Sequence, residues 1–495
     1  MNKSQKQGRP RFSKATRTLG VAFSLLVFLV FVAFFTWHAL VNHHGRKEWN
    51  AMKDLLRAEG IAYDLASLKK PMPPEAENFA ALPMIAAQCQ FDQIGGKVVY
   101  HHPELQARYK KLGMKSPKSF PNWKEDEFGD LAATAAQLLK DLGNDDASLT
   151  NQAPARQIAV KLESLRADLA EIDQYATRPE ASYPPLKLVE SPVENMRKLL
   201  PQFGPLMNLH TLQTSRVLAA LENAKLDEAI AGLRAMQQIE RTAGSQSLVL
   251  GMLIQLRLGD QKLSCVWSGL RRQQWRDQDL EEIQTMLFDH RLYDMAYRTF
   301  ETELVVMQFL GADYVANEPN GAISRLSQGE PERTILLYNK IFPRGTWEHN
   351  KAFASKCFLK DFLLPLQNEN FFFTNRQGEY DRDAANRAVA DLSLHYCHKV
   401  RNDLIDKAIE HDLFATACAI ERFRRSQQKI PANMDELVPK FLTDLPLDPW
   451  HIGDALSFRS EPENAAYKVY SIGPNGMVDA TEDQRTLRMP LPSVP

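Results

Sequence analysis

The feature that most constrains this chain is an uncharged apolar run near its N-terminus. Leu19–Leu40 comprises 22 consecutive positions without Asp, Glu, Lys or Arg. A helix of this length rises about 33 Å, because each residue adds ~1.5 Å. That is enough to cross a hydrocarbon core of about 30 Å. We therefore predict a single transmembrane helix that contacts the lipid bilayer through residues 19–40 and ties the rest of the chain to a membrane surface.

The charges before this run predict its orientation. The preceding residues include no acid and several bases, namely Lys3, Lys6, Arg9, Arg11, Lys14 and Arg17. An excess of Lys and Arg stays on the cytoplasmic side of a membrane, so residues 1–18 are expected to form a cytoplasmic tail and the chain after Asn42 to lie outside. Trp37-His38-Ala39 lacks the small-x-small pattern of a cleavage site, which favours an uncleaved signal anchor.

The composition fits a protein that stands in water on a membrane. The chain has a formal net charge of −1, with 24% charged and 44% apolar residues. This balance supplies ample core material and no basic surface for nucleic acid, which we exclude as a partner. The widely spaced cysteines form no C-x-x-C motif and argue against a disulfide scaffold or a cysteine metal site; they are Cys89, Cys265, Cys357, Cys397 and Cys418. One or two disulfides and buried free thiols both remain open.

Residues 41–130 form a juxtamembrane segment of mixed character. Glu48–Glu59 has apolar residues at helical spacing and is followed by Gly60, which favours a helix end. Lys69–Pro83 is rich in proline, so its first half is expected to run extended. Lys97–Tyr100 is a short strand candidate, and the remainder is irregular in pattern.

Residues 131–427 have the pattern of a helical body. Apolar residues recur at spacings of three and four in these segments: Leu131–Leu142, Ala155–Ala176, Met207–Glu222, Leu226–Thr242, Ser247–Leu258, Gln261–Gln273, Leu280–Phe288, Arg291–Phe309, Thr346–Leu364 and Asp381–Arg425. Glu222–Lys225 is a tight turn, which predicts an antiparallel αα-hairpin. The last segment is long enough to act as a spine. Gly311–Gly345 interrupts the pattern with prolines and glycines, which is typical of a long surface excursion that can line a groove.

Residues 428–495 change to a mixed α+β pattern. Met434–Val438 is a short helix candidate. Ala455–Arg459 and Tyr467–Ile472 are strand candidates that predict a β-hairpin, and Gly473-Pro474-Asn475-Gly476 is a strong turn signal after it. The predicted fold class is therefore mainly α, with a transmembrane helix, an antiparallel αα-hairpin body and a small C-terminal α+β domain.

The motifs of this C-terminal stretch resemble the globular domain of the major pseudopilins of type II secretion. The likeness rests on an ordered set of residues: Phe423, Ile430, Pro431, Leu437, Pro439, Leu442, Leu445, Pro446, Asp448, Pro449, Trp450, Gly453, Tyr470, Ser471, Gly473 and Gly476. It implies an acidic calcium loop, whose ligands here would come from Asn475, Asp479, Glu482 and Asp483. Gln428 and Asn475 depart from the family's glycine and aspartate, so an ordinary polar loop is the alternative to a calcium site.

The same resemblance fails at the other end of the chain. Pseudopilins have a Gly-Phe processing site, whereas Gly20 is followed by Val21 here. They also have a glutamate just inside the apolar helix, and this chain has no acid between Arg17 and Glu48. Processing and assembly as a pilin subunit are therefore not expected. Pro73–Pro83, with the spacing P-P-x-x-x-N-F-A-x-x-P, resembles a juxtamembrane pattern of uncharacterised bacterial membrane-anchored proteins. We accordingly expect a single-pass protein of the bacterial inner membrane with a periplasmic body.

Candidate chemistry elsewhere is sparse. His395 and His398 share a helical face with Asp391, which can be drawn as a metal site with two histidines and one carboxylate or as an ordinary helix surface. The pairs His43-His44 and His101-His102 are interpreted as solvated or membrane-proximal residues. The sequence contains no G-x-S-x-G, Walker or G-x-G-x-x-G motif.

Two classes of function follow from these patterns. The first is a non-enzymatic, membrane-anchored scaffold or secretion-associated protein whose terminal domain pairs with a secretion-system or envelope protein. The second is an anchored periplasmic hydrolase or ligand-binding protein with a cleft near residues 311–345. Phe371–Phe373 fits either a docking patch or the core. The resemblance of the terminal domain favours the first class. The second class has no nucleophile motif in its support.

Overall fold

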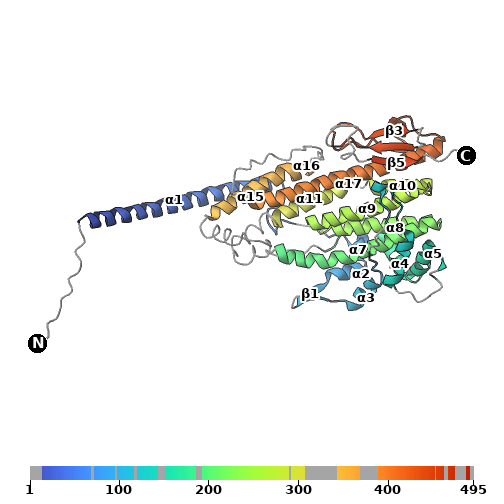
Figure 1. The fold of residues 1–495 in the computed structure, drawn as a ribbon, viewed down its shortest axis with the longest axis horizontal. Coiled ribbons are helices and arrows are strands. Elements are labelled where there is room, and N and C mark those ends of the chain that lie inside the picture. Colours follow the sequence, from blue (N-terminus) through green and yellow to red (C-terminus); the bar gives the residue numbers. More distant parts are fainter. Residues whose placement is uncertain are drawn as a thin grey trace.

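The molecule is an elongated helical body from which one long helix projects (Figure 1). The structure, a computed structural model, describes residues 14–490 except 69–71, 95–96, 116–119, 143–148, 150, 185–191, 289–290, 307–342, 368–387, 452, 462–465 and 474–485. It is mainly helical, with small antiparallel sheets, as predicted.

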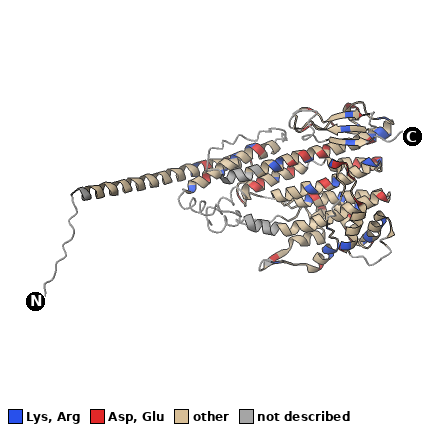
Figure 2. Ribbon diagram, in the orientation of Figure 1, with Lys and Arg blue, Asp and Glu red and all other residues tan. Residues whose placement is uncertain are grey.

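The projecting helix, α1, spans Lys14–Ala58 without a break. Its part from Thr18 onward is long and apolar enough to cross a membrane, and no residue of its most apolar stretch is buried inside the protein. Figure 2 shows this stretch without charged residues, while acids and bases appear where the helix meets the body. The separate helix expected from Glu48 is instead the C-terminal part of α1. Gly60, with φ +71°, follows its end as predicted.

The juxtamembrane segment folds against the body as short elements. They are the 3₁₀ helices Glu75–Glu77, Phe79–Ala81, Ala87–Cys89 and Trp123–Glu125, the helices α2 Pro83–Ala86 and α3 Pro103–Lys111, and the strands β1 Phe91–Ile94 and β2 Lys97–Tyr100. The predicted strand at 97–100 is therefore confirmed, and it pairs antiparallel with β1 so that Phe91 faces Tyr100. Part of the expected extended run, residues 69–71, lies outside the described residues.

The helical body contains the predicted segments with changed boundaries. Its helices are α4 Leu131–Leu142, α5 Pro154–Glu163, α6 Arg166–Ala176, α7 Pro192–Glu222, α8 Leu226–Gly244, α9 Val249–Arg271, α10 Asp277–Leu287, α11 Arg291–Glu303, α15 Arg344–Phe358, α16 Leu364–Gln367 and α17 Ala388–Gln427, and a π-helical turn at Leu359–Leu363 joins α15 to α16.

Two helix predictions in the body were wrong. The single helix expected over 155–176 is broken between α5 and α6, where the Ser164 hydroxyl donates to the Lys161 carbonyl (2.6 Å) and competes with the helical backbone bonds. The two helices expected over 247–273 are one, α9. Its glycine at 259 costs about 1 kcal/mol of helix propensity, but α9 packs between neighbouring helices and this burial outweighs the cost.

The predicted αα-hairpin is present as α7 and α8. The turn between them places Ala224 at φ 55°, and the Lys225 N–H donates back to the Ala220 carbonyl (2.8 Å). Buried side chains of α7 pack against those of α8 and α9, and α17 contributes to the same apolar core. α17 comprises 40 residues and is about 60 Å long, so it can serve as the spine that the sequence predicted.

The C-terminal domain is a small sheet packed on the end of α17. A 3₁₀ helix at Met434–Leu437 precedes β3 Ser457–Glu461, β4 Ala466–Tyr470 and β5 Thr486–Pro490, in the order β3-β4-β5. The predicted hairpin is confirmed as the antiparallel pair β3 and β4. The third strand was missed, because its five residues follow an acidic stretch and carry no turn signal of their own. In Figure 1 the sheet lies at the opposite end of the body from the projecting part of α1.

Candidate functional site

Three of the residues that carry the C-terminal resemblance, Asp448, Trp450 and Ser471, meet at one buried carboxylate. Asp448 Oδ1 accepts hydrogen bonds from the Trp450 backbone N–H (3.0 Å) and the Ser471 hydroxyl (2.9 Å). Its Oδ2 accepts from the Ile472 backbone N–H (3.0 Å). Asp448 is only 2% exposed, so its charge is solvated by these protein donors rather than by water. The D-P-W motif and the Y-S-x-G motif are therefore two halves of one hydrogen-bonded joint.

The same joint holds both ends of the predicted calcium segment. The His451 Nε2–H donates to the Gly473 carbonyl (2.7 Å), and Tyr470 pairs with Thr486 across β4 and β5. The four predicted calcium ligands lie outside the described residues; they are Asn475, Asp479, Glu482 and Asp483. The segment that contains them starts and ends at fixed points of the terminal domain.

The terminal domain is bonded to the body rather than linked loosely to it. The Gln284 side chain of α10 donates to the Phe441 carbonyl (2.6 Å). The Tyr467 hydroxyl of β4 donates to Glu421 of α17 (3.2 Å), and both side chains are buried. The apolar residues of the sheet belong to the same core cluster as those of the body. The domain is thus held in a defined orientation on α17.

Several described histidines of the predicted sites lie next to a carboxylate. The side chains of Asp391 and His395 lie outside the described part, and His398 lies 3.8 Å from Asp361. His44 pairs with Glu48 (3.2 Å), and His101 pairs with Asp92 (3.1 Å). Among the described residues, no group of three or more His, Cys, Asp or Glu side chains is arranged to hold a metal ion. All five cysteines are free thiols, and only Cys89 is not fully buried.

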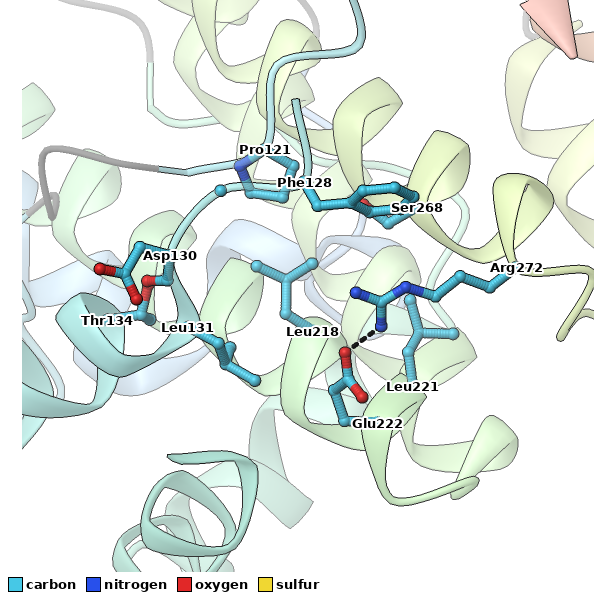
Figure 3. Close-up of a pocket in the computed structure, with 11 residues that line it drawn as sticks. Pro121, Phe128, Asp130, Leu131, Thr134, Leu218, Leu221, Glu222, Ser268 and Arg272 are labelled. Atoms are coloured by element: carbon cyan, nitrogen blue, oxygen red, sulfur yellow. Dashed lines mark hydrogen bonds and ion pairs between the residues drawn. The ribbon is translucent and has the colours of Figure 1, made fainter. Parts of the chain in front are cut away.

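A small cavity lies between α4, α7 and α9 (Figure 3). Glu222 and Arg272 form an ion pair at its edge, and the Arg272 guanidinium lies 4.8 Å from the centre of the Phe128 ring. Its volume is about 30 Å³. A space of this size holds about one water molecule, so the cavity is too small for an organic substrate.

A larger groove of about 430 Å³ lies where residues 72–77 and 180–182 meet α8 and α11. Arg241, Asp294 and Arg298 contribute charges of both signs to its wall. Two of its serine hydroxyls are bonded to backbone carbonyls: Ser245 donates to Thr242 (2.7 Å) and Ser247 to Ser245 (3.3 Å). Most of the cleft predicted at 311–345 lies outside the described residues.

A buried ionic cluster in the body was missed by the sequence reasoning. Glu240 of α8 accepts from Lys262 of α9 (2.6 Å) and from His210 of α7 (3.3 Å). All three side chains are at most 6% exposed. Burial by itself would raise the pKa of Glu240, but the Lys262 and His210 contacts outweigh it and lower that pKa to about 2. Glu240 is therefore a carboxylate throughout the physiological range.

A second cluster shares α9 with the first and adds residues of α17 and of the juxtamembrane segment. Lys407 of α17 contacts both Asp260 and Glu410, and Lys124 of the juxtamembrane segment lies 2.7 Å from Glu410. The nearby His411 stays neutral, because burial lowers its pKa to about 3. These charges come from segments far apart in the sequence, so no local motif could have revealed them.

The described part of the chain therefore contains a structured terminal joint, buried ionic clusters and an open groove. No protein-family model, curated protein or solved structure matches this chain, so its sites are assigned from their own chemistry.

Proposed function

We propose that the protein is a non-enzymatic, single-pass, membrane-anchored scaffold whose terminal domain docks a secretion-system or envelope protein outside the cytoplasm. One observation carries the proposal: the terminal sheet is bonded to the end of a helix about 60 Å long, at the end of the body opposite α1 (Figure 1). A rigid spacer of this kind holds a surface at a set distance from a membrane.

The resemblance to pseudopilin domains supports the docking role. Asp448, Trp450 and Ser471 are among the residues that carry the likeness, and they form one hydrogen-bonded joint. The motif therefore has a structural purpose in this chain. The basic N-terminal tail supports a cytoplasmic N-terminus and an inner-membrane location in a bacterium.

The terminal domain offers an exposed apolar residue for such a contact. Leu447 is 47% exposed, immediately before the buried Asp448. A single exposed leucine is common on protein surfaces, so the docking role of Leu447 depends on the substitution test below. We place the docking surface on the part of the terminal domain around Leu447.

A matched pair of substitutions tests the proposal. The full-length chain would be cross-linked in intact cells, purified in detergent and compared with Leu447→Asp. Val160→Asp on α5 is the control, because Val160 is also exposed (43%) but lies in the helical body. We expect a discrete cross-linked partner that is lost with Leu447→Asp and kept with Val160→Asp.

Two outcomes would overturn the docking role. One is a partner retained equally by both variants, and the other is a chain that cross-links to nothing while its groove near Arg241 binds a small molecule. The second outcome would favour the ligand-binding alternative.

A further inference from the structure

The height of the body above the membrane follows from the continuity of α1. Gly45 lies five positions after Leu40, where the apolar run ends. Five residues of helix rise about 7.5 Å. The headgroup layer extends about 5–8 Å beyond the hydrocarbon core on each side. Residues 41–45 therefore lie at the level of the lipid headgroups if α1 crosses the bilayer as proposed.

α15 contacts α1 at this level. Gly45 and Gly345 lie face to face, and a Cβ at either glycine would overlap the backbone of the other helix. The Gly345 N–H also donates to the Asn42 side chain (2.7 Å). This bond satisfies a free N–H of the α15 N-terminus, which Pro343 has no side chain to cap.

α15 runs away from the membrane alongside α1. His349 contacts Glu48, and the Lys351 ammonium lies 5.6 Å from the Trp49 ring centre. Successive residues of α15 thus meet successive residues of α1 (Figure 1). The first residue of α15, Arg344, is therefore at about the height of Asn42, inside the headgroup layer.

We propose that the α1–α15 crossing forms a second membrane contact, in which Arg344, Trp347 and Arg46 touch the phosphate layer of the outer leaflet. Arg344 is exposed, the Arg46 side chain is 68% exposed, and Trp347 is half-buried. A guanidinium binds phosphate oxygens through two parallel N–H bonds, and indole rings favour the membrane–water interface. This contact rests on the proposed anchor and adds that the body sits directly on the bilayer.

Two described acids, Glu48 and Glu348, lie near the crossing. Glu48 contacts His44 (3.2 Å) and His349. Glu348 lies 3.9 Å from Arg46, which leaves that guanidinium only weakly paired. We assign the exposed guanidiniums of Arg344 and Arg46 to the contact with lipid phosphate.

Depth measurement on the full-length chain tests the contact. Spin labels at Arg344→Cys, Phe28→Cys and Val160→Cys would be placed one at a time in the protein reconstituted into phosphatidylcholine vesicles that contain a nickel-chelating lipid. Labelled wild-type protein gives the background from the native thiols, which are mostly buried. We expect headgroup nickel to relax the label at 344 several-fold more than the label at 160.

The label at Phe28 separates this inference from the anchor itself. Oxygen relaxes a label inside the hydrocarbon core more strongly than water-soluble reagents do. A Phe28 label in hydrocarbon together with an unrelaxed label at 344 would refute the second contact and leave the anchor standing. A Phe28 label in water would refute the anchor and the contact together.

A glycine substitution gives an independent check. Gly345→Ala places a methyl group against the Val41 carbonyl, so α15 must move away from α1. Gly204→Ala in α7 is the matched control, because nothing lies within 4 Å of its added Cβ. Nickel relaxation of the 344 label should fall in the Gly345→Ala background and stay unchanged in the Gly204→Ala background. Equal relaxation in both backgrounds would contradict the role of the crossing.

Discussion

The body and the terminal domain each bury a carboxylate, and they stabilise it in different ways. Glu240 is paired with Lys262 and hydrogen-bonded to His210, and both partners come from other helices. Among the described residues, Asp448 accepts from two backbone N–H groups and one hydroxyl, all within 24 positions of it. The buried carboxylate of the body is stabilised by an ionic cluster between helices, whereas that of the terminal domain is stabilised by neutral hydrogen-bond donors.

Removing one charge from the body cluster should have the largest effect. Lys262→Met leaves Glu240 buried without its main cation and should cost about 3–5 kcal/mol in the free energy of unfolding. The double variant Lys262→Met/Glu240→Gln should recover most of that loss. Urea unfolding of the detergent-solubilised chain, followed by helical circular dichroism, measures both.

The control for this experiment is an exposed ion pair. Lys225→Met breaks the contact with Glu228, in which the lysine is 59% exposed, and should cost less than about 1 kcal/mol. Equal losses for Lys262→Met and Lys225→Met would show that the buried cluster is no stronger than an exposed pair.

Glu303 is a third buried carboxyl, and within the described part of the chain it has neither a cation partner nor several hydrogen-bond donors. Among the described residues its carboxyl accepts one long hydrogen bond, from the Val249 N–H (3.4 Å), and burial raises its pKa to about 7. Between pH 4.3 and 7 the folded chain keeps a proton that the unfolded chain has lost, so stability falls as the pH rises through this window. Glu303→Gln should therefore be stabilising by up to about 3 kcal/mol at pH 8 and nearly neutral at pH 4.

Thermal unfolding at the two pH values tests this prediction. Glu125→Gln is the control, because Glu125 is exposed and should give no pH-dependent gain. A gain at pH 4 as large as that at pH 8 would mean that the carboxyl of Glu303 is not the cause.

Breaking the terminal joint should have a smaller and more local effect. Asp448→Asn turns one acceptor oxygen into an NH₂ group that cannot accept from the Ile472 or Ser471 donors, which should cost about 1–3 kcal/mol. Hydrogen exchange should accelerate in residues 434–473 and leave α7–α9 protected. Asp444→Asn, whose side chain is exposed, is the control. Faster exchange throughout the body would show that the two regions are a single cooperative unit.

The smallest expected effect concerns calcium. A loop that uses Asn475, Asp479 and Asp483 with a Kd of about 1 mM would stabilise the terminal domain by about 1 kcal/mol at ~5 mM calcium. The terminal domain would then be stabilised by calcium from solution, whereas Glu240 in the body is paired with the Lys262 side chain. The full-length protein is needed, because the domain shares its core with α17.

The calcium measurement is the shift in terminal-domain hydrogen exchange on adding calcium to chelator-treated protein. The variant Asp479→Asn/Asp483→Asn should lose the shift while magnesium leaves both proteins unchanged. Absence of any calcium effect on the wild-type chain would favour the polar-loop interpretation.

Local signals in the sequence predicted most of the elements. The apolar run, the helical periodicity, the turn at Glu222–Lys225 and the β-hairpin are all properties of neighbouring residues, and the described structure contains each of them. Helix boundaries were less predictable: α9 runs through its glycines because tertiary burial outweighs their low helix propensity. The third strand was missed because its pairing with β4 is a contact between separate segments.

The sequence by itself determined the long uncharged span and the order of the D-P-W and Y-S-x-G motifs, since both depend on residue type and spacing alone. Only the tertiary structure showed that Asp448 joins the two motifs, that Glu240 meets Lys262 and His210, and that Gly45 meets Gly345. Such contacts link residues up to hundreds of positions apart. Their geometry is set by how whole helices pack, and no local pattern encodes it.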